Sequence, residues 1–97
     1  ALTDQFIYYA QGDICAMFEP VLLPNVWAVH IGAKPAGWGK LVEPFEAVLQ
    51  EFWNDFEPRR IVAWVLDKKP HARLLARRAG FIEDGRFDGV LMMGWRP

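Results

Sequence analysis

The chain has 97 residues, a formal net charge of −1 and a composition that is 53% hydrophobic and 14% aromatic. This length is typical of one domain, so we expect residues 1–97 to fold as a single unit, and the apolar content argues against disorder. The nearly balanced charge excludes a protein drawn to nucleic acid or to an anionic membrane by its overall field. The apolar runs are too short to span a bilayer.

The N-terminus and the only cysteine bear on the compartment. No basic region followed by an apolar one opens the chain, so no secretory signal is expected. Cys15 cannot form an internal disulfide, and we expect it to be a small core residue in a reducing, cytoplasmic environment. Neither His30 nor His71 has neighbours at metal-ligand spacing, so no metal site is expected.

The first thirty residues read as strands. Residues 6–10 and 14–23 predict a hairpin with a turn at residues 11–13, and the second strand is interrupted near Pro20. Residues 26–31 predict a third strand. Its alternation places Trp27, Val29 and Ile31 on one face and His30 on the other.

The next elements alternate between helix and strand. A long helix is predicted from apolar residues spaced three and four apart, namely Leu41, Phe45, Val48, Leu49, Phe52, Trp53 and Phe56. Pro44 is tolerated only in a first turn, which places the start of this helix at residues 41–43. Residues 61–66 form a continuous apolar run, which predicts a central strand covered on both faces.

Pro70 opens a second helix that runs to about residue 79, where Gly80 ends it. Residues 81–87 and 90–95 predict two more strands joined by a turn at Asp88-Gly89. The order is therefore β-β-β-α-β-α-β-β. We expect an α+β domain with a mixed, mostly antiparallel sheet.

The most informative segment is the loop at residues 34–39, between the third strand and the long helix. Gly37 and Gly39 allow bare backbone N–H groups to approach a ligand, and the N-terminus of the following helix favours phosphate. Other phosphate motifs do not fit: Val42 stands where a dinucleotide fold needs a third glycine, and Leu41 where a Walker loop needs Ser or Thr. The loop by itself is also compatible with a plain turn.

Two motifs together make the assignment more specific. The loop reads Lys34-x-x-Gly37-x-Gly39, and a second segment from Lys69 ends in Gly80-Phe81. In this spacing and order, the chain resembles the core of the GNAT superfamily of N-acetyltransferases. The resemblance implies a GNAT-like (acyl-CoA N-acyltransferase) fold that lacks the usual two N-terminal helices, and it implies acetyl-CoA as the cofactor.

The resemblance also implies the cofactor contacts. Backbone of Val29, His30 and Ile31 would pair with the pantetheine arm. The pyrophosphate would lie on the loop, and its neighbours there would be Lys34, Ala36, Gly37, Trp38, Gly39 and Lys40. The 3′-phosphate would meet Lys69, His71 and Arg73, although a solvated basic helix face is the alternative for these residues.

Two positions depart from the family pattern: Lys69 replaces the usual Asn, and Ala76 replaces the Tyr that protonates the departing thiolate. By resemblance the reaction is acyl transfer to an amine acceptor that the sequence does not identify. His30 is the leading candidate for the base, with a structural hydrogen bond as its alternative role. Glu19 and Glu83 are more distant candidates for the base.

Trp64 lies on the strand opposite the predicted cofactor strand, where it is placed to line the acceptor cleft. An alternative function is a non-catalytic binding or assembly module of the same fold, in a phage particle, because short chains of this kind occur in phage and prophage genomes. An exposed N-terminal strand and five tryptophans make a homodimer plausible. No nucleic-acid or membrane partner is expected.

Overall fold

The computed structural model describes residues 6–21, 23–33 and 40–97. Its elements follow the predicted order and are β1 (Ile7–Gln11), β2 (Ile14–Pro20), β3 (Val26–Ala33), α1 (Val42–Phe56), β4 (Arg60–Leu66), α2 (Pro70–Arg78), β5 (Ile82–Phe87) and β6 (Val90–Trp95). β2 ends at Pro20 and is therefore shorter than predicted. Within these ranges no helix is both long and apolar enough to cross a bilayer.

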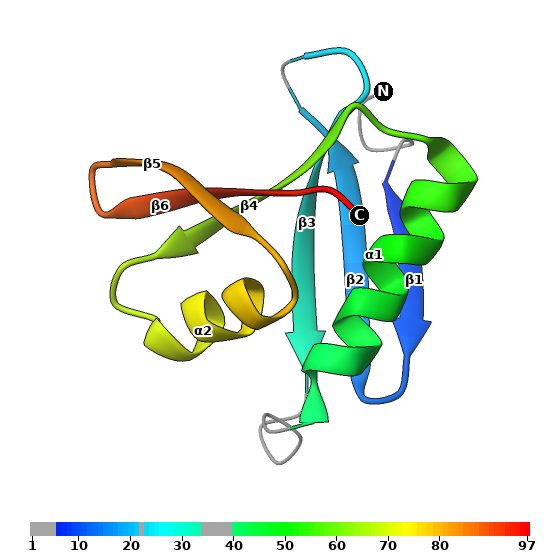
Figure 1. Cartoon of the computed structure of the whole chain (residues 1–97), viewed down its shortest axis with the longest axis horizontal. Coiled ribbons are helices and arrows are strands. Elements are labelled where there is room, and N and C mark those ends of the chain that lie inside the picture. The colour runs from blue at the N-terminus through cyan, green and yellow to red at the C-terminus, as the bar shows by residue number, and fades with distance from the viewer. Residues whose placement is uncertain (1–5, 22, 34–39) are drawn as a thin grey trace.

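The six strands form one sheet in the order β1-β2-β3-β4-β6-β5 (Figure 1). Four of the five neighbouring pairs are antiparallel, and only β3 and β4 run parallel. The predicted α+β class with a mostly antiparallel sheet is confirmed. The single parallel pair follows from the chain path, because α1 carries the chain from the end of β3 back to the start of β4.

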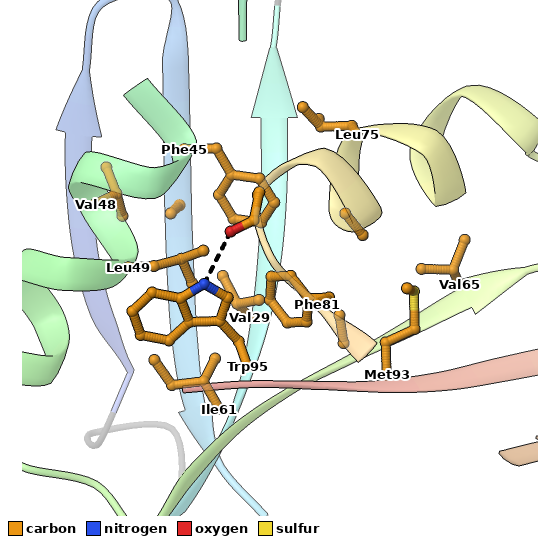
Figure 2. Packing of buried hydrophobic residues seen from close by; sticks show 14 of the residues in the cluster. Val29, Phe45, Val48, Leu49, Ile61, Val65, Leu75, Phe81, Met93 and Trp95 are labelled. Carbon is orange, nitrogen blue, oxygen red and sulfur yellow. Dashed lines mark hydrogen bonds between the residues drawn. The ribbon is translucent and has the colours of Figure 1, made fainter. Parts of the chain in front are cut away.

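Both helices cover the same face of the sheet and enclose one apolar core. From the helices the core takes Phe45, Val48, Leu49, Phe52, Leu75, Ala76 and Ala79, and from the strands it takes alternate residues such as Ala16, Phe18, Val29, Ala63, Leu91 and Met93. The rings of Phe18 and Phe52 stack with centroids 3.9 Å apart. Figure 2 shows how Trp95, Phe81 and Phe45 converge between the helices and the sheet.

In the described structure, no helix covers the other face of the sheet. Cross-strand register places on this open face Tyr8, Cys15, Met17, Glu19, His30, Trp64, Leu66 and Met92. The prediction that residues 61–66 are covered on both faces is wrong, because Trp64 and Leu66 are 50% and 39% exposed. The prediction of a core Cys15 is also wrong, since its strand turns it to the open face.

The end of α2 is fixed by its glycine and by a tryptophan from β6. Gly80 has φ +106°, a left-handed conformation that a side chain would strain. A Cβ at this position would also lie 3.2 Å from Nε1 of Trp95. That indole N–H donates to the Ala79 carbonyl over 2.9 Å, and the bond is drawn in Figure 2. The predicted stop at Gly80 is confirmed.

Candidate functional site

The sheet is split between its two parallel strands. β3 and β4 pair over only three positions, from Val26↔Arg60 to Ala28↔Val62. Both strands continue beyond this point, to Ala33 and Leu66, and Figure 1 shows them diverging with α2 beside the opening. In the described structure, therefore, the facing edges of β3 and β4 beyond these pairs have no strand partner. Backbone hydrogen-bonding groups on these edges are available to a ligand.

A cavity of about 300 Å³ lies in this split. From the helix-covered face its lining includes Val29, Phe45, Ala63, Val65, Ala72 and Ala76. From the open face it includes His30, Trp64 and Leu66, and Lys69 also lines it. The split is thus lined from both faces of the sheet. We call this cavity, with these lining residues, the cleft.

A second cavity of about 540 Å³ adjoins the cleft and shares Ile31, Lys69 and Ala72 with it. Its other lining residues are Gly32, Leu41, Lys68, Pro70, His71 and Leu75. Among the described residues no carboxylate lies within ion-pair distance of Lys68 or Lys69. Both lysines also lie at the N-terminus of α2, where the helix dipole favours negative charge. This basic cavity suits an anionic group joined to an apolar chain.

The structure brings several of the predicted site residues together here. Val29 and His30 line the cleft, His71 lines the basic cavity, and Ile31 and Lys69 line both. Lys40 lines neither cavity and lies in a separate pocket with Val42, Glu43 and Glu46. Five predicted cofactor contacts fall outside the described residues, namely Lys34, Ala36, Gly37, Trp38 and Gly39.

Arg73 is not among the residues that line either cavity. Its Nε and Nη2 donate to Oε1 of Glu83 over 3.0 and 2.7 Å, and Nη2 of Arg77 donates to the same oxygen over 2.7 Å. These arginines, Arg73 first, hold the pKa of the Glu83 carboxyl below its ordinary value. The cluster ties α2 to β5. Glu83 is engaged there and is absent from the lining of the cleft, although it was a candidate for the base.

His30 has a carboxylate partner on the neighbouring strand. Nε2 of His30 lies 2.5 Å from Oε1 of Glu19, and their side chains are 46% and 28% exposed. β2 and β3 pair with Met17 opposite His30, so Glu19 lies diagonally across from the histidine on the same face. His30 lines the cleft from the open face, and Glu19 lies beside it without lining the cleft.

Sequence reasoning gave Glu19 only as a distant candidate and did not list Lys68 or Leu66 as site residues. The alternation of β2 puts Glu19 on the face of His30 only once the register of the two strands is known. The doublet Lys68-Lys69 before Pro70 does point to an anion site, because lysines beside a helix N-terminus add positive charge where anions bind. Ala76 is buried in the cleft and offers no hydroxyl there.

The described residues contain no group of three or more His, Cys, Asp or Glu side chains that could hold a metal ion. The arrangement offers instead an apolar slot between strands, a basic cavity that adjoins it and a histidine–carboxylate pair on the open face. These are the elements for holding a thioester of an anionic carrier and for accepting a proton beside it.

Comparison with known proteins finds no family model that matches this chain. No curated protein matches its sequence significantly. Solved structures do match its fold. An acetyltransferase of the GNAT family from Bacillus anthracis superimposes with a TM-score of 0.74 at 13% identity, over 84% of this chain and 57% of that chain.

Two further structures contain ligands. The Campylobacter jejuni N-acetyltransferase PseH in complex with acetyl coenzyme A gives a TM-score of 0.70 at 13% identity, over 86% of this chain and 58% of that one. Spermidine N-acetyltransferase from Vibrio cholerae in complex with CoA and spermine gives 0.69 at 18% identity, over 84% and 56%. This chain thus spans less than two thirds of the length of each of these proteins. On these similarities, the chain has the fold of the GNAT acetyltransferases.

Proposed function

We propose that this chain binds acetyl-CoA in the split between β3 and β4 and transfers the acetyl group to an amine. The observation that carries the proposal is the parallel pair that separates after three positions and leaves a cleft lined from both faces of the sheet. The fold shared with N-acetyltransferases, two of them in complexes with CoA or acetyl-CoA, supports the cofactor.

The two cavities suggest how the cofactor lies. Its pantetheine arm would pair with the free edge of β3 at residues 29–31, and its acetyl group would enter the cleft. Its phosphates would lie toward the basic cavity, near Lys68, Lys69 and the N-terminus of α2. Acetyl-CoA thus matches both the apolar slot and the positive charge at its end.

In the reaction, the neutral amine attacks the thioester carbonyl carbon, and the carbonyl oxygen becomes an oxyanion. Backbone N–H groups on the free edge of β3 would stabilise that charge. The attacking nitrogen gives a proton to His30, and the C–S bond breaks as the amide forms. Because Ala76 has no proton to donate, the departing thiolate takes its proton from solvent.

Calorimetric titration of the chain with acetyl-CoA and with CoA tests the proposal. We expect micromolar affinity, which Lys69→Glu weakens about 10-fold to 100-fold by turning a charged contact into a repulsion. Gly37→Glu should abolish binding if the glycine loop approaches the phosphates, as the sequence motif implies. Arg59→Glu is the matched control, since this exposed residue lies just before the start of β4, whereas Lys69 lies after its end.

Absence of binding by the unchanged chain at millimolar acetyl-CoA would refute the proposal. A chain that binds acetyl-CoA but acetylates none of a panel of primary amines, spermine included, would be a binding module and not an enzyme. An equal loss of affinity in Lys69→Glu and Arg59→Glu would remove the basic cavity from the cofactor site.

A further inference from the structure

On the open face, a carboxylate residue, Glu19, lies beside the proposed base His30. We propose that the amine acceptor reaches the cleft from the open face, and that Glu19 is a positioning residue that holds His30 with Nδ1 free to take the acceptor's proton. The proposal rests on the function proposed above. It adds the face of the sheet from which the amine enters, and a residue that acts through His30 without touching the cofactor.

The geometry of the sheet supports this division of sides. Along β4, Ala63 and Val65 face the helices, while Trp64 and Leu66 face the open side, and all four line the cleft. On β3, Val29 faces the core, and His30 is on the open face. The helix-covered side is filled by the core, α1 and α2. In the described part of the chain, the open side is where a second substrate can approach without displacing a helix or strand.

The contact between Glu19 and His30 fixes the tautomer of the ring. An ionised carboxylate only accepts hydrogen bonds, so Nε2 of His30 must carry the proton that bridges the 2.5 Å to Oε1. A neutral imidazole has one N–H, and its lone pair is then on Nδ1. The bond also sets the rotation of a side chain that is otherwise 46% exposed. Glu19 therefore presents a basic nitrogen in a defined direction.

Among the described residues, the register places the ionisable side chains of Glu19 and Cys15 on β2 beside this histidine, and that of Tyr8 one strand further away. Lys69, at the start of α2, is the other charged residue in the described lining of the cleft. A carboxylate beside the ring also stabilises the imidazolium that forms when the proton arrives. The proton that the attacking nitrogen loses goes to Nδ1 and then to solvent. Nε2 keeps its own proton on Glu19 throughout.

The first test requires no activity. The chain has two histidines, so ¹⁵N imidazole spectra with His71→Gln assign His30 directly. In the unchanged chain, at a pH high enough for the imidazole to be neutral, we expect the Nε2–H tautomer of His30. In Glu19→Met, which keeps the chain length and removes both oxygens, we expect a mixture of tautomers. Glu46→Met, on the exposed side of α1, is the matched control. An identical tautomer in Glu19→Met and the unchanged chain overturns the role of Glu19.

The second test measures transfer to 2-phenylethylamine, whose aromatic group can pack on the exposed Trp64. We expect Glu19→Met to lower kcat about 10-fold to 100-fold with the KM for acetyl-CoA unchanged, because a misdirected base loses rate and not cofactor affinity. Glu19→Asp should recover part of the rate. Trp64→Ala should raise the KM for the amine at least threefold and leave that for acetyl-CoA unchanged.

The outcomes separate this proposal from the function on which it rests. An unchanged kcat in Glu19→Met overturns the positioning role, and an unchanged amine KM in Trp64→Ala overturns entry from the open face. Failure of the unchanged chain to bind acetyl-CoA in calorimetry refutes the proposed function, whatever the histidine spectra show. If the unchanged chain binds acetyl-CoA but the tautomer of His30 stays the same in Glu19→Met, only the positioning role of Glu19 is refuted.

Discussion

The two faces of the sheet differ in what they can contribute. The helix-covered face is a continuous apolar core, and no polar or charged residue is buried in the described structure. The open face carries His30, Glu19 and exposed apolar residues such as Trp64 and Met92. One face supplies the free energy of folding through burial of apolar surface, and the other presents the groups that can meet a ligand.

This difference leads to an expectation about mutations. Changes on the helix-covered face away from the cleft should reduce stability and affect function only through folding. Changes on the open face should leave stability nearly intact and act on binding or rate. A residue that violates this division would show that the faces are coupled, most directly through the cleft, which is lined from both.

The largest effect is expected at Phe52, which is fully buried, stacks on Phe18 and also contacts Trp27. Phe52→Ala should lower the free energy of unfolding by about 3–5 kcal/mol, because it removes transfer free energy and leaves a cavity. Urea denaturation followed by tryptophan fluorescence measures it. Phe52→Leu should lose less and stay folded, and a loss below 1 kcal/mol (on the order of a surface change) for Phe52→Ala would contradict this account of the core.

The next largest loss of stability is expected at Trp95, and it can be compared with that at Trp27, whose indole lies on the same helix-covered face. Trp95 donates to the Ala79 carbonyl, whereas Nε1 of Trp27 is buried with no hydrogen-bond partner in the described part of the chain. Trp95→Phe should cost about 1–3 kcal/mol, since it leaves a buried carbonyl unsatisfied. Trp27→Phe should cost less, because it also removes an unsatisfied donor. Thermal unfolding of the two variants compares them, and the reverse order would show that hydrogen bonding does not decide the difference.

A smaller effect, which depends on pH, is expected at Glu83. The hydrogen bond from Arg73 lowers the pKa of this carboxyl below its ordinary value of 4.5, and Arg77 adds to the effect. A lowered pKa in the folded state stabilises the protein above the unfolded value, and this stabilisation is lost as the pH falls through the folded value. Stability should therefore fall below about pH 4.5 in the unchanged chain and fall less steeply in Glu83→Gln. Acid titration of both by circular dichroism measures it, and equal slopes would contradict the assignment.

The smallest effect on stability is expected on the open face. Trp64 is 50% exposed, and Trp64→Ala should change the free energy of unfolding by no more than about 0.5 kcal/mol. Urea denaturation measures this change. A loss comparable to that in Phe52→Leu would mean that another part of the protein covers this face in solution.

Much of the fold could be predicted because its signals are local. The spacing of Phe45, Val48 and Phe52 predicts α1, and Gly80 predicts the end of α2. The error at residues 61–66 arose because an apolar run shows that a strand is central but not whether helices cover one face or two. Cys15 was misplaced for the same reason, since its surroundings depend on which face the helices choose.

The site depends on pairing between distant segments, which local pattern does not contain. Glu19 meets His30 only through the register of β2 and β3, and Arg73 turns to Glu83 because β5 lies beside α2. The predicted cofactor strand does line the cleft, at residues 29–31. This part could be predicted because the strand directly precedes the glycine loop in the sequence.

The split between β3 and β4 also has a consequence for amide hydrogen exchange. β3 pairs with β2 from Trp27 to Ala33, but in the described structure it pairs with β4 over only three residues. Alternate amides of residues 29–33 therefore face the split. In the free protein these amides should exchange with deuterium as quickly as those of an edge strand, while their immediate neighbours, bonded to β2, stay protected. A ligand that pairs with this edge would make the protection of the strand uniform, so the exchange pattern would record occupancy residue by residue.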